Sequence, residues 1–519
     1  MTPARKKGAG PGRSGPGGGA RSIPIVGARP GNRDGGSPQR AERTNPGPPR
    51  RGAEADVTLV NLNLLYIKLD DRIDYEAHPP LGLLYLTSVL EQKGYSVDLV
   101  DYQVLPRVRP DMDPFNLETA LGYIGATAAV VGFSCMANLL PFTLLVAERF
   151  KRLHPEKTIL LGGVGPFGVE SAILARFPWI DAVVRGEAEL SLPLILDALP
   201  DRERLAQVPG VFLRRPDGSV FQTASPERIP DLDRLPLPAY HRLDMAAYDA
   251  FGIVSSRGCP YGCRFCSVAP IWDRRTTRRS HANIIEEMRL LHEGYGVKTV
   301  LFQDEFFFSS EAKILDFCDR LQASGLPMRW KCYGRVNLVT EPAMRRMAEA
   351  GCIQLRFGIE SGSDRVLKRI VKGFEFRDAL RAVTQALGIF ESVETFFIWG
   401  FPFEEMEDFY ATTLQMARFR QMGVTVLPSL LSMLPQTDIY REYREGRYGG
   451  SLDLIPALIP IYVVTGHEVV GALNRVPNRY RPYYDFIGAH PDIFPGFFLY
   501  DHETNVRPKH AVLQQMGFA

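Results

Sequence analysis

The chain has 519 residues, of which 45% are hydrophobic and 23% are charged, so it is long enough to form several folded domains. Its formal net charge of +2 does not suggest a nucleic-acid partner. The sequence has no secretory signal and no run of about 18 consecutive apolar residues, so it predicts neither export nor a membrane span and favours a cytoplasmic location.

Residues 1–55 form a basic segment in which Gly, Pro and Arg dominate. Such a segment cannot bury enough apolar surface to offset its conformational entropy, so we expect it to be disordered. A solvated leader and a nucleic-acid contact are both compatible with its charge. We interpret it as a solvated leader.

Residues 56–205 alternate short apolar runs with amphipathic stretches such as 79–95 and 139–154. This alternation is typical of repeated strand–helix units and predicts a doubly wound parallel sheet. Ligands bind such sheets at the carboxyl ends of the strands. The expected strands are 56–65, 95–101, 128–135, 157–163 and 181–187.

Residues 206–250 are expected to connect two domains. The pattern at 208–223 predicts a hairpin with Asp217-Gly218 as its turn. Residues 229–244 contain too many prolines for a regular element and too many apolar residues for a free linker. We therefore expect a strap that packs between the two domains.

Residues 251–445 repeat the strand–helix alternation six times, which predicts a partial (β/α)6 barrel of the TIM type with its site at the strand carboxyl ends. The expected strands lie within 251–258, 298–305, 328–336, 353–360, 392–402 and 424–434. Residues 446–519 form a small C-terminal segment that we expect to be a lid or substrate element. Its aromatic residues Tyr480, Tyr483 and Phe498 fit either a lid or interdomain packing.

Three cysteines, Cys259, Cys263 and Cys266, follow the first expected barrel strand. Three thiolates are one ligand short of a closed zinc or 4Fe-4S site, and the open metal position suits catalysis. A zinc site completed by His281 or by a distant cysteine is the alternative. The spacing of Cys318, Cys332 and Cys352 predicts no second cluster.

The cysteine segment SRGCPYGCRFCS resembles the signature of the radical S-adenosylmethionine superfamily, and the resemblance covers about 251–434. It implies a 4Fe-4S cluster on the three cysteines, S-adenosylmethionine on the open iron, and formation of a 5′-deoxyadenosyl radical. It also implies contacts to S-adenosylmethionine from Phe265, Asp304 or Glu305, Arg335, Glu360 and Ser361. The segment FIWGFPFEEMEDF resembles the family's Gly-Phe-Pro-Gly-Glu-Thr loop, but it departs from that pattern: Phe403 and Glu404 stand where Gly and Glu are expected, and Glu405 replaces Thr.

The segments PPLGLLYLTSVLEQKGYSVDLVD, VGFSC and LLGGVGP resemble the cobalamin-binding domain found in one branch of this superfamily. The resemblance implies cobalamin and makes Ser134, Gly162 and Gly163 its candidate contacts. The Asp-x-His-x-x-Gly motif of many corrinoid proteins is missing, so His78 need not be a cobalt ligand. Cys135 could approach cobalt, but it is more typical of a buried filler.

By this resemblance, the chain is expected to be a cobalamin-dependent radical enzyme that transfers a methyl group to carbon or phosphorus of a small molecule or natural-product intermediate. A cyclase or rearrangement enzyme of the same architecture fits the motifs equally well. A non-catalytic iron–sulfur or corrinoid-binding protein is the alternative from another class. The chemistry implies a reducing partner such as flavodoxin or ferredoxin.

Overall fold

The computed structural model describes residues 52–62, 77–307, 309–455 and 481–518, and every element discussed here belongs to one compact unit, Pro49–Ala519. The predicted disordered segment 1–55 lies almost entirely outside the described residues. Within the described ranges, no helix has the length and apolar character needed to cross a membrane.

The first part of the unit is built on a seven-stranded sheet with the order β2-β1-β3-β4-β5-β6-β7. The strands are β1 Val57–Asn61, β2 Val97–Asp101, β3 Val130–Ser134, β4 Thr158–Gly162, β5 Ala182–Val184, β6 Val211–Arg214 and β7 Val220–Gln222. Strands β1 to β5 pair in parallel, whereas β6 and β7 form the predicted hairpin and continue the sheet in antiparallel register from β5. The doubly wound sheet is thus confirmed, and the hairpin extends it.

Helices cover both faces of this sheet, as its apolar strands require. Val57 and Leu59 of β1 pack on one face with the core under α1 Leu81–Gln92 and α6 Ala188–Ala198. Val60 points to the other face, where the core includes residues of α3 Leu117–Ile124, α4 Leu140–Leu153 and α5 Glu170–Arg176. Alternate residues of one strand therefore serve two cores.

The second part contains a six-stranded parallel sheet with the order β15-β14-β13-β12-β11-β8. Its strands are β8 Phe251–Ile253, β11 Thr299–Phe302, β12 Arg329–Gly334, β13 Cys352–Glu360, β14 Ser392–Trp399 and β15 Thr425–Leu430. The strand order runs from β8 to β15 without closing, so the predicted partial barrel is confirmed.

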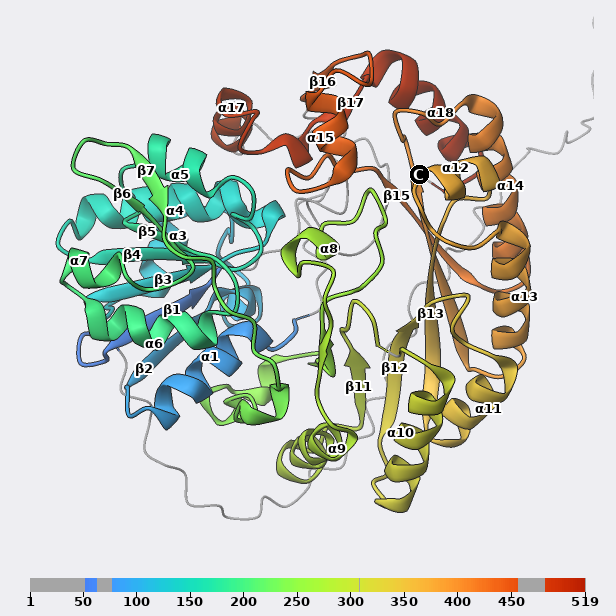
Figure 1. The fold of residues 1–519 in the computed structure, drawn as a ribbon, viewed down its shortest axis with the longest axis horizontal. Helices are drawn as coiled ribbons and strands as arrows, with labels where there is room; N and C mark the ends of the chain where they lie inside the picture. The colour runs from blue at the N-terminus through green and yellow to red at the C-terminus, as the bar shows by residue number, and fades with distance from the viewer. Residues whose placement is uncertain (1–51, 63–76, 308, 456–480, 519) are drawn as a thin grey trace, which may run out of the picture. The chain divides into compact units, whose positions relative to one another are not determined.

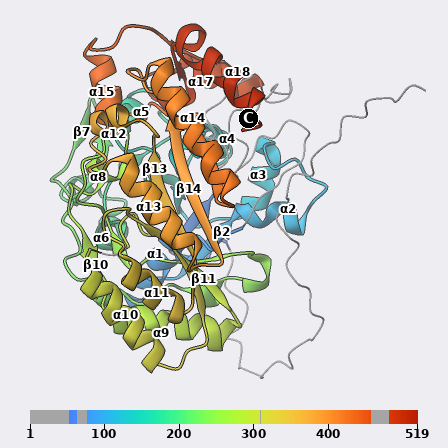
Figure 2. The ribbon, with the colours of Figure 1, turned by 90° about the vertical axis from the view of Figure 1, so that its right-hand side faces the viewer.

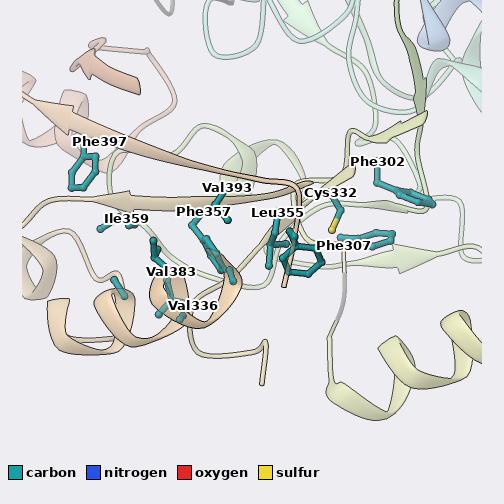
Figure 3. Packing of buried hydrophobic residues seen from close by; sticks show 14 of the residues in the cluster. Phe302, Phe307, Cys332, Val336, Leu355, Phe357, Ile359, Val383, Val393 and Phe397 are labelled. Carbon is teal, nitrogen blue, oxygen red and sulfur yellow. The ribbon is translucent and has the colours of Figure 1, made fainter. Parts of the chain in front are cut away.

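Helices lie on the convex side of this open barrel, outside the strands (Figures 1 and 2). They are α9 His281–Arg289, α10 Glu311–Ala323, α11 Glu341–Glu349, α12 Asp364–Arg369, α13 Phe376–Leu387 and α14 Met406–Gln421. Figure 3 shows apolar side chains of the strands, including Phe357 of β13 and Val393 of β14, gathered with Val383 of α13 in one core. This layer between strands and helices holds the strand ends in place.

The strap between the sheets is anchored by a buried carboxylate. Glu187, just before α6, accepts hydrogen bonds from Arg228 Nε at 2.9 Å, from the backbone N–H of Ile229 at 2.8 Å and from Arg257 Nη1 at 2.8 Å. Glu189 accepts a further bond from Arg257 Nη2 at 2.6 Å. Arg257 lies in the short strand β9 Ser256–Arg257, two residues before the first cysteine of the triplet.

The C-terminal segment packs against both cores. Tyr484, in α17 Arg481–Ala489, and Phe498 belong to the first core, and the Tyr483 hydroxyl donates a hydrogen bond to the carbonyl of Phe115. Leu513 in α18 Arg507–Gln515 and Val506, which directly precedes this helix, belong to the barrel core. Tyr480 lies outside the described residues. Packing is therefore what the structure describes for Tyr483 and Phe498.

Glu187 is expected to contribute strongly to stability. Glu187→Gln leaves the buried cations Arg228 and Arg257 without their shared carboxylate, so the free energy of unfolding should fall by about 3 kcal/mol. Chemical denaturation of the purified chain measures this change. Glu391→Gln removes an exposed pair with Arg329 and should stay within about 0.5 kcal/mol of the wild type. Equal losses in the two variants would contradict this account.

Candidate functional site

A cavity of about 900 Å³ lies where strand ends from both sheets meet. It is lined at strand ends by Asn61, Ser134 and Gly163 from the first sheet and by Asp304, Arg335 and Glu360 from the barrel. In the first sheet, β1 and β3 are the strands between which the strand order reverses. Open α/β sheets bind ligands at this position, and barrels bind them at their strand carboxyl ends.

The predicted cobalamin residues lie at this edge of the first sheet. Ser134 and Gly163 line the cavity, and Gly162 precedes Gly163 at the end of β4. Gly163 has φ +86°, and a Cβ there would lie 2.5 Å from the carbonyl oxygen of Cys135. Glycine is therefore required at this position for the packing of two loops of the chain, which form the floor of the cavity.

His78 and Cys135 also line the cavity. The backbone of His78 is fixed by Gln103, which accepts from the His78 N–H at 3.1 Å and donates to the His78 carbonyl at 2.6 Å. The His78 ring nitrogen Nδ1 lies 3.5 Å from Nε2 of Gln303 in the barrel. Burial raises the pKa of the Cys135 thiol to about 12, so this thiol stays protonated at neutral pH.

The three cysteines of the triplet share one loop, but they face different surroundings. Cys259 and Cys266 line the cavity, whereas the Cys263 sulfur lies 3.8 Å from the carbonyl oxygen of Val371. The backbone N–H of Cys266 donates to the Cys263 carbonyl at 3.0 Å. Burial raises the pKa of the Cys259 thiol, and it raises the pKa of the Cys266 thiol to about 11. Metal binding must therefore displace protons from the loop.

The donor set fits a cluster better than a single zinc ion. Among the residues that the structure describes, no group of His, Cys, Asp and Glu side chains could hold one metal ion. Cysteines of a 4Fe-4S cluster bind different iron atoms, so they need not converge on one point. His281, the predicted alternative ligand, instead bonds Asp316 Oδ2 through Nδ1 at 2.7 Å. The structure therefore gives no support to a zinc site at His281.

The two predicted strand-end acids have different partners. Asp304 is buried and accepts hydrogen bonds from the N–H and hydroxyl of Ser255 and from the hydroxyl of Ser256, which lie beside β8 and β9. Burial raises the pKa of Asp304 to about 6. Glu305 faces the cavity and, among the described residues, accepts two long hydrogen bonds of 3.3 Å each, from the N–H of Gly258 and from Nε1 of Trp272. The hydrogen bonds within the chain to Glu305 are therefore longer than those to Asp304, so the Glu305 carboxylate is the better placed of the two to accept a hydrogen bond from a ligand.

Glu360 ends β13 at a register shift and adopts φ +72°, a left-handed conformation that side chains rarely take. Its carboxylate is buried and bonds the Lys372 ammonium group at 2.7 Å, and both residues line the cavity. Sequence reasoning missed Lys372, since no motif marks it. Ser361 is buried against Thr412, 3.0 Å between their hydroxyl oxygens, and does not line the cavity.

Arg335 lies over the ring of Tyr261, with 3.5 Å between the guanidinium carbon and the ring centroid, and donates through Nη2 to the carbonyl of Lys372. Its Nε is buried without a hydrogen-bond partner among the described residues. A buried, unsatisfied cationic donor beside the cysteine loop fits a carboxylate-bearing cofactor. Phe265 packs edge-on to Phe401 at 6.2 Å and does not line the cavity.

The loop after β14, whose sequence departs from the family pattern, is fixed by the C-terminal helix α18. Glu404 is buried, accepts from the N–H of Gly400 at 2.8 Å and pairs with the buried Lys509 ammonium group at 2.9 Å. The Lys509 ammonium group also donates a hydrogen bond to the side-chain oxygen of Asn505 at 2.5 Å. Glu404 therefore has a structural partner that the loop sequence alone did not reveal.

Two family models match the chain. The B12 binding domain matches residues 74–196, and the Radical SAM superfamily matches residues 253–415. An uncharacterized methyltransferase of Pyrococcus horikoshii is 31% identical over 339 residues, which cover 64% of this chain and 72% of the relative. The chain belongs to the cobalamin-dependent radical S-adenosylmethionine enzymes. Its cofactors are accordingly a 4Fe-4S cluster, S-adenosylmethionine and cobalamin, and a non-catalytic role is set aside.

One further relative and one solved structure are similar to this chain. An anaerobic magnesium-protoporphyrin IX monomethyl ester cyclase of Synechocystis is 28% identical over 366 residues, which cover 67% of this chain and 69% of the relative. The structure of TsrM from Kitasatospora setae, a radical S-adenosylmethionine methyltransferase, matches with a TM-score of 0.65 at 18% identity, covering 89% of this chain and 88% of that chain. The last comparison concerns the fold alone.

Asp304 is expected to make stability depend on pH. Its folded pKa of about 6 lies above the ordinary 3.8, so its contribution is fully present below about pH 4 and is lost as the pH rises through 6. In the metal-free chain, Asp304→Asn should gain up to about 3 kcal/mol relative to the wild type between about pH 4 and about pH 7. Urea denaturation across this pH range measures the difference.

The exposed Asp316 serves as the control of opposite sign. Arg320 and His281 lower the pKa of its carboxyl, so its contribution is present at neutral pH and is lost in acid. Asp316→Asn should therefore lose stability relative to the wild type as the pH rises. Identical pH profiles for the wild type and Asp304→Asn would contradict the assignment of a raised pKa to Asp304.

We expect loss of iron when a cysteine of the triplet is replaced, but not when a cysteine of the barrel core is replaced. After anaerobic reconstitution, Cys263→Ala should bind markedly less iron and sulfide than the wild type, because one of the three thiols predicted to hold the cluster is removed. Iron and sulfide analysis per chain provides the measurement. Cys352→Ala, which alters a buried cysteine of the barrel core, should retain the wild-type content. Retention of full iron and sulfide content by Cys263→Ala would exclude Cys263 as a ligand.

Proposed function

We propose that this enzyme is a cobalamin-dependent radical methyltransferase that acts on a small molecule, at an unactivated carbon or at phosphorus. One observation carries the proposal. A single cavity is lined both by Ser134 and Gly163, at the ligand-binding edge of the first sheet, and by Cys259 and Cys266 of the cysteine loop. A substrate in this cavity would be within reach of both cofactors.

When bound, cobalamin supplies a methyl carrier, and the cluster with S-adenosylmethionine supplies hydrogen abstraction. Cys259, Cys263 and Cys266 are proposed to hold the cluster, and Ser134, Gly162 and Gly163 to border the cobalamin. For S-adenosylmethionine, we propose that Arg335 donates to the carboxylate through its unsatisfied Nε and that Glu305 receives the ammonium group. Asp304 would then position the strand end, since Ser255 and Ser256 occupy its oxygens.

The other predicted residues have supporting places around the same cavity. Glu360 is proposed to contact the cofactor while Lys372 balances its charge. Ser361 and Phe265 are proposed to position residues that line the cavity, without lining it themselves. Ser361 fixes the turn after β13 through its contact with Thr412, and the ring centroid of Phe265 lies 5.8 Å from the Lys372 ammonium group. The electron that starts the reaction is proposed to come from flavodoxin or ferredoxin.

Methyl transfer is preferred to cyclisation because the relative with the higher identity is named a methyltransferase. The 28% identical cyclase keeps ring formation as the second candidate. The two reactions differ in their products from S-adenosylmethionine. Methyl transfer through cobalamin consumes one molecule as a methyl donor and leaves S-adenosylhomocysteine, whereas cyclisation needs no such donor.

The distinguishing experiment uses the chain reconstituted anaerobically with iron, sulfide and cobalamin and reduced with dithionite. We expect deoxyadenosine, S-adenosylhomocysteine and transfer of label from methyl-labelled S-adenosylmethionine to cobalamin. Cys263→Ala should lose deoxyadenosine. Deoxyadenosine without S-adenosylhomocysteine and without labelled cobalamin would favour the cyclase. Formation of neither deoxyadenosine nor S-adenosylhomocysteine by a loaded protein would contradict radical chemistry.

A further inference from the structure

The cysteine loop has an outer side that the cavity does not use. Cys263 contacts the carbonyl of Val371 at 3.8 Å. The neighbouring Arg264 donates its backbone N–H to the carbonyl of Ile370 at 3.1 Å and its Nη1 to the carbonyl of Arg369 at 3.0 Å. The carbonyl groups of three consecutive residues, 369 to 371, therefore contact the cysteine loop. A molecule bound to the outer surface of this segment would be separated from Cys263 by the backbone of residues 369–371.

Val371 is an unusual residue for this place. It follows α12 with φ +58°, in the left-handed region where a β-branched residue is strained, and the residue is 51% exposed. The N–H of Lys372 bonds the carbonyl of Leu367 at 3.0 Å, which is the helix-ending turn that normally takes glycine. An exposed valine here is unfavourable both for the backbone and for solvation, so packing within the chain does not explain it.

Cations surround Val371. Lys368 and Arg369 are exposed in the last turn of α12, and Arg369 is held over the ring of Phe403 at 4.4 Å. Arg274, with 59% of its side chain exposed, lies over the cysteine loop, since a Cβ on Gly262 would be 3.1 Å from its Nη1. The neighbouring acids are paired: Glu442 pairs with Arg264, and Asp438 pairs with Arg441 at 2.9 Å and with Arg274 at 3.9 Å. Asp273 is the exposed acid beside Arg274.

We propose that this surface, Val371 with Arg274, Lys368 and Arg369 around it, is the docking site for a small acidic one-electron carrier. An apolar centre with a charged rim is the usual build of a transient interface, and a basic rim attracts an acidic partner. In the proposed step the carrier would be oxidised by one electron, and the 4Fe-4S cluster proposed on Cys259, Cys263 and Cys266 would be reduced by that electron; no bond forms or breaks and no proton moves. The inference rests on the proposed cluster site and adds where its electron enters.

A second basic concavity offers a competing location. It has a volume of about 380 Å³ and is lined by Arg278, His281, Lys313 and Arg320, together with Asp316. Arg320 and His281 are both engaged by Asp316, and Arg278 donates to the carbonyls of Phe306 and Phe307. These hydrogen bonds go to groups outside the triplet, whereas Val371 contacts Cys263 directly, so we prefer the Val371 surface. Lys313 provides a matched control.

The test compares two reductants on the reconstituted enzyme, reduced flavodoxin and dithionite, with deoxyadenosine formation as the readout. Lys368→Glu combined with Arg369→Glu should raise the KM for flavodoxin about tenfold and leave the dithionite-driven rate within about twofold of the wild type. The wild-type KM should rise with salt, and the variant's should respond less. Lys313→Glu should behave as the wild type.

The variant Val371→Gly provides a second, independent test of the docking site. It removes the apolar centre and relieves the left-handed strain, so it should raise the KM for flavodoxin several-fold without lowering the thermal unfolding midpoint. A rise in KM for Lys313→Glu instead of the double variant would overturn the proposal. Parallel loss of the dithionite-driven rate would also overturn it, because the residues would then support only the loop.

Direct binding separates this inference from the proposed function. Calorimetric titration of flavodoxin into the reconstituted protein needs no turnover, and the double variant should bind about tenfold more weakly than the wild type. Absence of deoxyadenosine with both reductants, together with salt-dependent flavodoxin binding lost in the double variant, would reject the proposed function and keep the docking site. Equal binding by the wild type and the double variant would reject the docking site alone.

Discussion

The buried carboxylate of Glu187 is the interaction on which the arrangement of the site depends. It follows β5 of the first sheet, yet it bonds Arg228 and Ile229 at the start of the strap and Arg257 immediately before the cysteine loop. Each group alone would be costly to bury, and together they satisfy one another. Because Arg257 is also bonded by Glu189, the start of the loop is fixed to the first sheet from two directions.

This anchor explains how two sheets with separate cores share one cavity. Ser134 and Gly163 lie at the ligand edge of one parallel sheet, and Asp304, Arg335 and Glu360 lie at the corresponding edge of the other. With the loop fixed between them, the two edges face the same cavity. The three cysteines of the loop do not all face this cavity. Cys259 and Cys266 face the cavity, whereas Cys263 lies under the exposed Val371.

Local patterns predicted much of this architecture. The apolar strands, such as Val57–Asn61 and Val130–Ser134, and the cysteine spacing are short-range signals, and they identified both sheets and the loop. The pairs that tune the site are not short-range. Arg257 and Glu187 are 70 residues apart, and Lys509 reaches the carbonyl of Glu404 from 105 residues away. Pairing across such distances follows from tertiary packing, which neither periodicity nor composition reveals.

The most direct test of the shared cavity is electron paramagnetic resonance of the reconstituted protein with both cob(II)alamin and the reduced cluster. If the two cofactors occupy one cavity, their spins should interact, and the cob(II)alamin signal should broaden when the cluster is reduced. Cys263→Ala, expected to lack a complete cluster, should show the unbroadened signal. A wild-type spectrum equal to the sum of the two isolated centres would contradict the account.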